Sequence, residues 1–344
     1  MSKNPTNLLQ SGYHSRRLRW RITTLLLAIL TFTLCTAMLI LGNKLYPPEI
    51  ILRVLLGEEI KGATFAIGAL RLPRMLSGLL VGLAFGLAGS TFQTMLRNPL
   101  ASPDIIGVTS GSSVAAVFCL LVLKVSTGIA SFAAVATGLL VAALIYYLSR
   151  GGSFSGGRLI LIGIGVQAML NAVISFLMLR ASQYDVPGAL RWLSGSLNGV
   201  QMRDIPGLFL IVTLFGSILL LLGKHLRILE LGEQLATTLG LKADQIRLIL
   251  VFSSVALIAF ATATTGPVAF VAFLSGPIAV KLVGTGASPL LPSGLVGASL
   301  VLGADLIGQF AFNTRFPVGV ITGILGAPYL LFLLIRMNRT GGSS

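Results

Sequence analysis

Long runs without a charged residue recur along the whole chain and are separated by short charged segments. Most of these runs are 19–25 residues long, and a helix needs roughly 20 apolar residues to cross the core of a bilayer. Strands of a membrane barrel would instead alternate over about ten residues. The pattern therefore predicts transmembrane helices. The runs are 22–43, 75–96, 105–123, 125–149, 159–179, 205–223, 248–280, 282–314 (interrupted by Asp305) and 316–335.

One run is too long for a single crossing. Residues 248–280 would form a helix of about 50 Å, whereas the hydrocarbon core is about 30 Å thick. Gly266-Pro267 lies inside this run, and proline breaks a helix because it lacks a backbone donor and clashes with the preceding turn. We therefore expect two helices here, the second one short. The sequence predicts an all-α polytopic membrane protein with about ten transmembrane helices.

Composition excludes a soluble enzyme. Of the 344 residues 55% are apolar and only 10% are charged, against about 25% charged in soluble domains. Short cytoplasmic loops carry an excess of Lys and Arg. Placing both termini in the cytoplasm puts 15 of the 25 basic residues on that side. The net charge of +15 thus reflects membrane topology, and we expect no nucleic-acid partner.

The expected organisation has three parts. Residues 1–21 form a basic cytoplasmic N-terminus, residues 22–336 form the ten-helix membrane domain, and residues 337–344 form a cytoplasmic tail. Within the membrane domain, residues 224–247 form the longest cytoplasmic loop.

Neither catalysis nor metal binding is indicated by the sequence. No Gly-x-Ser-x-Gly or His-Glu-x-x-His motif occurs, and His14 and His225 have no partners at metal-ligand spacing. The glycine-rich stretch 151–158 lacks the Gly-Lys-Ser/Thr that cradles a nucleotide. We expect no catalytic residue, metal or cofactor on this chain, and any ATP must bind to another chain.

Small residues line one face of the second predicted helix. Gly78, Gly82, Gly86 and Ser90 recur every four positions, a spacing that lets another helix approach closely. Tight packing is the expected role. Tight packing is compatible with a second role, in which this face slides along its neighbour when a transporter changes state.

Polar residues line one face of the fifth predicted helix. Gln167, Asn171 and Ser175 again recur every four positions. Buried polar groups in lipid need partners, so these side chains either bond neighbouring helices or line a wet translocation pathway.

Asp305 is the only acidic residue inside a predicted span. An intramembrane carboxylate is a candidate proton carrier. No second acid is available in a span to continue a proton relay, so a structural carboxylate that bonds a neighbouring helix is the favoured interpretation.

The cytoplasmic loop 224–247 carries more leucines than a solvated loop needs. Its pattern predicts short amphipathic helices that stop at Gly240. A docking element for a cytoplasmic protein accounts for these leucines.

Several distinctive motifs lie between about residues 60 and 336. The central motif includes Arg97, Asn98, Pro99, Pro103 and Gly107. It is accompanied by Arg71-Leu72-Pro73-Arg74, Gln93, Ala304-Asp305, Phe316-Pro317-Val318-Gly319-Val320 and Gly326-Ala327-Pro328. Together these motifs resemble the FecCD-type permeases of ABC importers for iron-siderophores, haem and cobalamin.

The resemblance implies a complete importer. Two permease chains would surround the pathway, with two cytoplasmic ATPase subunits that bind Mg-ATP and an extracytoplasmic substrate-binding protein. It further implies an inverted repeat, a bacterial inner-membrane location and a ferric siderophore as the most probable substrate class. Coupling to the ATPase would involve Gly232, Glu233, Leu239 and Gly240, and the fifth helix would line the pathway.

External arginines are the expected docking residues for the binding protein. Arg71 and Arg74 flank Pro73 at the start of the second span, where positive-inside topology does not explain them. Some family members carry a further arginine where this chain has Gly308, and Arg315 is its expected replacement. Besides Gly308, the chain departs from the family pattern at one more place. It has Gly276-Pro277-Ile278-Ala279-Val280-Lys281, where the family usually has Pro-His-Ile-x-Arg.

An ion-coupled secondary transporter that uses Asp305 is the alternative function. Broken helices occur in such transporters, so the break in 248–280 does not discriminate. The loop 224–247 does, because a secondary transporter needs no docking element for an ATPase.

Overall fold

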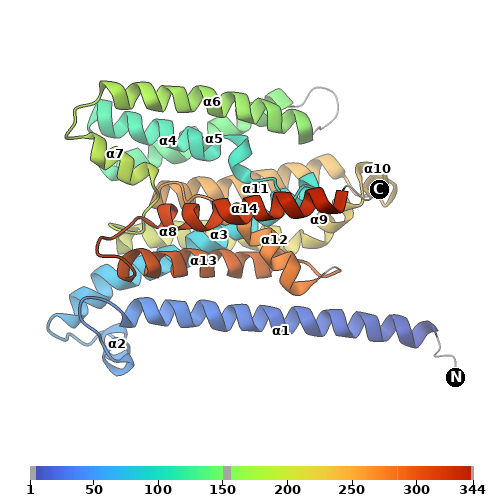
Figure 1. Cartoon of the computed structure of the whole chain (residues 1–344), viewed down its shortest axis with the longest axis horizontal. Coiled ribbons are helices and arrows are strands. Elements are labelled where there is room, and N and C mark those ends of the chain that lie inside the picture. The colour runs from blue at the N-terminus through green and yellow to red at the C-terminus, as the bar shows by residue number, and fades with distance from the viewer. Residues whose placement is uncertain (1–4, 150–155, 285, 342–344) are drawn as a thin grey trace.

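A computed structural model describes residues 5–149, 156–284 and 286–341 as a bundle of helices (Figure 1). Parts of the predicted terminal segments and most of the glycine-rich stretch 151–158 lie outside the described residues. The helices are α1 (Pro5–Ile40), α2 (Pro48–Leu55), α3 (Leu72–Leu96), α4 (Val108–Phe118), α5 (Thr127–Ser149), α6 (Gly156–Arg180), α7 (Val186–Leu193), α8 (Ile205–Leu221), α9 (Gly223–Glu230), α10 (Glu233–Thr238), α11 (Ala243–Thr265), α12 (Val271–Val283), α13 (Leu290–Phe310) and α14 (Val318–Gly341).

Within the part of the chain that the structure describes, seven helices are long and apolar enough to cross a membrane. They are His14–Ile40, Phe65–Leu96, Thr127–Ser149, Gly156–Arg180, Met202–Leu221, Ala243–Thr265 and Leu290–Phe310. The other three predicted spans fall on shorter apolar helices at Val108–Leu123, Val271–Val283 and Val318–Leu333. The all-α membrane class is confirmed, while the count of ten spans and the inverted repeat stay predictions.

The predicted break in the run 248–280 is confirmed. Helix α11 ends at Thr265 and α12 begins at Val271. Between them Gly266 has a φ of 75°, and a Cβ added there would lie 2.1 Å from the carbonyl oxygen of Trp192. Only glycine fits this turn, because it combines a positive φ with a close backbone approach. The break makes α12 short, at 13 residues.

Helix α3 forms the centre of the bundle. In its apolar stretch 83% of the residues are buried, and it packs against α8, α11, α12 and α13. The contact with α13 is backbone to backbone: Cβ atoms added at Gly82 and Gly86 would lie 2.4 Å from the Cα of Ala298 and 2.2 Å from the carbonyl oxygen of Ser293. At Gly78 an added Cβ would lie 3.0 Å from the side chains of Leu197 and Leu302.

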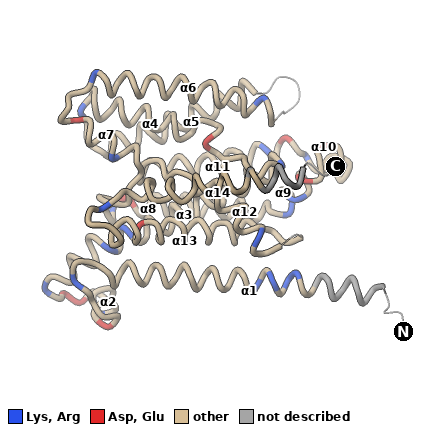
Figure 2. Tube along the Cα trace, viewed as in Figure 1, with Lys and Arg blue, Asp and Glu red and all other residues tan. Residues whose placement is uncertain are grey.

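The two ends of the bundle differ. Helix α1 begins and α14 ends at the end of the bundle that carries α9 and α10, whereas α2 and α7 lie at the opposite end (Figure 1). Charged residues gather toward these two ends and leave most of the helices' length without charge (Figure 2). Helix α1 is continuous from Pro5 into the first predicted span, so the described part of the predicted basic segment 1–21 is helical. Likewise the predicted tail begins as the last turns of α14.

Candidate functional site

Helix α6 presents the predicted polar stripe on a face that no other element covers. Only 11% of its apolar stretch is buried, against 83% for α3, and α6 lies at the edge of the bundle (Figure 1). Asn171 and Ser175 are exposed and Gln167 is half-buried. The Ser175 hydroxyl donates to the Asn171 carbonyl oxygen of its own helix at 3.0 Å. The structure shows no hydrogen bond from this stripe to a neighbouring described helix, so the stripe is free to face water or a second chain.

Two short helices and the turns beside them make up the predicted coupling segment. Gly232, with a φ of 124°, separates α9 from α10, and Gly240, with a φ of 80°, follows the end of α10. Both values favour glycine. Leu231, Leu235 and Leu239 are 59%, 56% and 65% exposed. Helical spacing places Leu235 and Leu239 on one side of α10, and Leu231 lies just before the turn at Gly232. These three exposed leucines form the apolar stripe at this end of the bundle.

A buried arginine holds this segment against the bundle. Arg247 of α11 is 7% exposed and contacts Glu233 at 3.0 Å and Asp244 at 3.1 Å. Glu233 thus attaches α10 to α11. The sequence prediction missed Arg247. Its spacing of three residues from Asp244 is a helical ion-pair signal, but the contact with Glu233 depends on the turn at Gly240.

Arg74, a predicted docking residue, is paired within the chain, and its docking role stays a prediction. Its guanidinium binds Asp305 of α13 through two hydrogen bonds of 2.8 Å each. The Asp305 side chain is 1% exposed and also accepts a hydrogen bond of 2.7 Å from the Gln309 amide. Asp305 is therefore a structural carboxylate that joins α3 to α13.

Arg71 is also occupied within the chain. It donates to the carbonyl oxygens of Leu39, Ile40 and Lys44 at 2.6–2.9 Å, and its guanidinium lies 5.0 Å from the Tyr46 ring centroid. These contacts fasten the turn after α1 to the start of α3. Because its guanidinium is engaged within the chain, a docking role for Arg71 stays a prediction.

Arg315 is the exposed member of the three predicted docking arginines. It donates to the side chain of Asn43 at 2.9 Å. Gly308 leaves no room for an arginine, because an added Cβ would lie 2.7 Å from the carbonyl oxygen of Phe316.

The central family motif forms the turn between α3 and α4. Arg97 ends α3 with a φ of 51°, and Gly107 begins α4 with a φ of 68°. The Asn98 side chain accepts the amide of Leu100, while Pro99 follows it and Pro103 begins a short 3₁₀ turn. Within that turn Asp104 accepts the hydroxyls of Ser102 and Thr109, and burial raises the pKa of its carboxyl.

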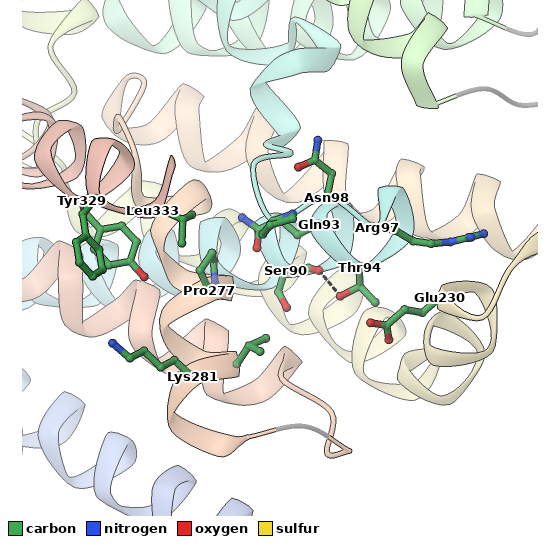
Figure 3. Close-up of a pocket in the computed structure, with 14 residues that line it drawn as sticks. Ser90, Gln93, Thr94, Arg97, Asn98, Glu230, Pro277, Lys281, Tyr329 and Leu333 are labelled. Atoms are coloured by element: carbon green, nitrogen blue, oxygen red, sulfur yellow. Dashed lines mark hydrogen bonds between the residues drawn. The ribbon is translucent and has the colours of Figure 1, made fainter. Parts of the chain in front are cut away.

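A pocket of about 670 Å³ opens beside this turn, between the ends of α3 and α12, the end of α9 and the second half of α14 (Figure 3). Gln93 lies at its inner side, where the Gln93 amide donates to the Phe273 carbonyl oxygen at 2.9 Å. Gly276 makes this possible, since an added Cβ there would lie 1.8 Å from Oε1 of Gln93. Arg97, Glu230 and Lys281 supply the charges of the lining.

No group of three His, Cys, Asp or Glu side chains that could hold a metal occurs among the residues that the structure describes. Cys35 and Cys119 are free thiols.

Comparison with known proteins places these features in context. The model of the FecCD transport family matches residues 25–336. The ferric enterobactin transport system permease protein FepG of Escherichia coli is 36% identical over 83% of this chain and 87% of its own length. The achromobactin transport system permease protein CbrC of Dickeya dadantii is 36% identical over 90% of both chains. A solved structure described as an inward-facing metal-chelate type ABC transporter matches with a TM-score of 0.81 and 28% identity over 91% of this chain and 98% of that chain.

Proposed function

The chain belongs to the FecCD transport family, and from this premise we propose that it is the permease subunit of a binding-protein-dependent ABC importer for ferric siderophores. It is a transport subunit and not an enzyme, and ATP hydrolysis belongs to a separate ATPase subunit that binds Mg-ATP. Full-length similarity to permeases for ferric enterobactin and achromobactin supports the substrate class. The observation that carries the proposal is the pairing of an uncovered polar helix face in the membrane with an exposed apolar element at one end of the bundle.

The uncovered face of α6 is the proposed half of the translocation pathway. Gln167, Asn171 and Ser175 lie on a helix that packs against α4 and α5 on one side and leaves Asn171 and Ser175 exposed in the lone chain. Polar groups facing lipid are unfavourable. A second permease chain, identical or homologous, would remove them from lipid and enclose a polar passage between the two copies.

The apolar stripe of Leu231, Leu235 and Leu239 is the proposed contact with the ATPase, and an importer of this kind carries two such subunits. Gly232 and Gly240 set the turns on either side of α10. The Arg247–Glu233 contact connects α10 to α11. A movement of the bound ATPase against the leucines would therefore be transmitted to the membrane helix α11. Most of the leucine surface is solvent-exposed in the lone chain, as expected of a surface that awaits a partner.

The orientation follows from the ATPase contact. The chain lies in the inner membrane of a bacterial cell. Its end that carries α9 and α10 faces the cytoplasm, and both termini lie on that side. The opposite end, with α2, α7 and the exposed Arg315, faces the extracytoplasmic binding protein. Arg315 is the proposed docking group there, while Arg71 and Arg74 act indirectly by holding the external ends of α1, α3 and α13 together.

No observation favours the ion-coupled alternative. Asp305 is the only acid in a predicted span, and both of its oxygens are engaged by Arg74. A proton carrier needs a carboxylate that exchanges its proton with water, whereas this one is 1% exposed and paired with a cation.

Purification in mild detergent tests the proposal. The wild-type chain is expected to retain an ATPase and a second permease. Leu239→Asp should lose the ATPase and keep the second permease, because the contact would bury an unpaired charge. Gln234→Asp, which adds the same charge to an exposed position of α10 outside the leucine stripe, is the matched control and should retain both. Isolation of the wild-type chain alone would contradict the proposal.

A further inference from the structure

Helix α2 carries a group of leucines that the described part of the chain leaves exposed. Its Ile51 and Val54 are buried in the core, whereas Leu52, Leu55 and Leu56 are 60%, 45% and 87% exposed. We call these three leucines the α2 flank. Large apolar side chains that lie together on a surface mark a contact with another molecule or with a membrane.

The residues around the axis of α2 fall into three faces. At about 100° per residue, the buried face is followed around the axis by the α2 flank and then by Glu49 and Arg53, which are both exposed. Arg53 also forms an ion pair with Glu58 just beyond the helix. A helix that lies at a membrane surface has this distribution, because its apolar side chains meet acyl chains and its charged ones meet headgroups and water.

Helix α2 also lies at the level where membrane helices begin and end. It contacts the end of α1 and the segment Phe65–Arg71. The membrane stretch of α1 ends at Ile40, and the segment Phe65–Arg71 opens the membrane stretch Phe65–Leu96. A helix packed against both of these ends is held close to the boundary between hydrocarbon and headgroups.

The position of α2 across the bundle leaves its flank to lipid. In Figure 1, α2 lies beside the end of α1, on the side of the bundle away from α6. The second permease chain proposed to cover α6 therefore does not reach α2. Helix α1 itself is poorly covered, since only 22% of its apolar stretch is buried. The exposed face of a spanning helix meets acyl chains, so this side of the bundle is its lipid-facing side.

The α2 flank continues this lipid-facing surface. Exposed apolar side chains follow one another along the chain from Phe32 of α1 through Leu41 and Leu45 to the flank. On the neighbouring segment, Phe65 and Leu70 are also exposed. One occupant, the bilayer, can cover α1, the flank and these side chains together. A water-soluble protein could reach only the part that stands outside the membrane.

We propose that α2 is an interfacial helix that binds the surface of the lipid bilayer. The α2 flank inserts among the upper parts of the acyl chains, and Glu49 and Arg53 lie among headgroups and water. With the orientation proposed above, the lipids belong to the outer leaflet of the inner membrane, and the opposite orientation would change only the leaflet. Helix α2 thereby anchors the end of α1 and the beginning of α3 to the membrane, and its flank is closed to the binding protein.

Fluorescence quenching in lipid nanodiscs tests this placement. In the complete complex, with Cys35 and Cys119 replaced by alanine, Leu52→Cys and Leu55→Cys are each labelled with an environment-sensitive dye. Arg53→Cys is the matched control, because Arg53 lies between them in the sequence but on the charged face. At Leu52→Cys and Leu55→Cys we expect emission at shorter wavelength than at Arg53→Cys, strong quenching by lipid that carries a nitroxide near the top of its acyl chain, and protection from iodide. At Arg53→Cys the two quenchers should act in the opposite order.

Two results would overturn the proposal. Quenching by iodide at Leu52→Cys and Leu55→Cys as strong as at Arg53→Cys would place the flank in water. Protection from iodide that arises only when the loaded binding protein is added would identify the flank as a docking surface for that protein. The two leucine positions report independently, so the test remains available if one variant fails to assemble. Neither result depends on whether the chain imports ferric siderophores.

Discussion

At the scale of single residues, one ion pair connects the two most closely packed helices. Arg74 and Asp305 form two hydrogen bonds at 2.8 Å, and Gln309 supplies a third to the carboxylate. Replacing a buried ion pair by apolar residues is often tolerated, whereas removing one partner leaves an unpaired buried charge. The pair is therefore best regarded as a constraint on how α3 and α13 meet.

Removing one partner of this pair should cost much more stability than removing both. Asp305→Leu leaves the Arg74 guanidinium without its ion-pair partner and is expected to destabilise the chain by about 3–5 kcal/mol. Arg74→Met combined with Asp305→Leu should recover most of that loss. Thermal unfolding of the purified complex measures both. A single variant as stable as the wild type would contradict a structural role for the pair.

The sequence could single out Asp305 but not its partner. An acid inside an apolar run is visible from composition, and a structural carboxylate was the favoured interpretation. Arg74, however, is 231 positions away, and its place at the predicted external end of a span suggests a docking role instead. The partners of Arg71 could not be predicted either, because they are backbone carbonyls of another turn. Pairing across the fold depends on how the helices pack.

At the scale of helices, close backbone contact decides the position of α3. Gly82 and Gly86 lie against Ala298 and Ser293 with no space for a side chain. In membranes such small-residue contacts supply packing energy where the hydrophobic effect does not. The four-residue spacing identified this face in the sequence, although it did not identify α13 as the opposing helix.

A methyl group at this contact should separate the helices. Gly82→Ala would place a Cβ 2.4 Å from the Cα of Ala298, and overpacking of this kind costs about 1–3 kcal/mol. Gly303→Ala on α13 is the matched control, because nothing lies within 4 Å of its added Cβ, and it should be neutral or stabilising. Thermal unfolding in detergent compares the two. Equal stability of both variants would refute the packing role of Gly82.

Helix α6 should be wet on one side only. With Cys35 and Cys119 replaced by alanine, cysteines at Gln167, Asn171 and Ser175 should react with a small water-soluble thiol reagent in the assembled importer. Met169→Cys is the control, since Met169 is 71% exposed in the lone chain but points about 160° away from Gln167 around the helix axis. It should face lipid and stay protected.

Reactivity at the stripe should also change when nucleotide shifts the importer between states. Complete protection of all three stripe positions in every state would favour hydrogen bonding to a neighbouring chain over a wet pathway.

At the scale of the whole molecule, charge position was enough to predict most of the architecture. Nearly every boundary of a predicted span lies within a few residues of a helix end, because a charge is tolerated only where a helix leaves the bilayer. The break at Gly266-Pro267 was also predictable. Three predicted spans proved to be short helices. The length of an apolar run in the sequence does not show where the helix begins and ends within that run.

The structure adds what charge counting could not supply. The lone chain leaves α6 uncovered and presents a row of leucines at one end of the bundle. Both features are incomplete surfaces, one within the membrane and one outside it. The proposed importer, with two permeases and two ATPases, would cover both surfaces.

Uptake by the reconstituted complex tests the central claim most directly. Proteoliposomes that contain the chain, its second permease and the ATPase subunits are supplied with a ferric siderophore on its binding protein, and accumulation of labelled iron is measured. Accumulation should require Mg-ATP on the ATPase side and should persist when a protonophore removes the proton gradient. Accumulation driven by a proton gradient in the absence of ATP would contradict the account.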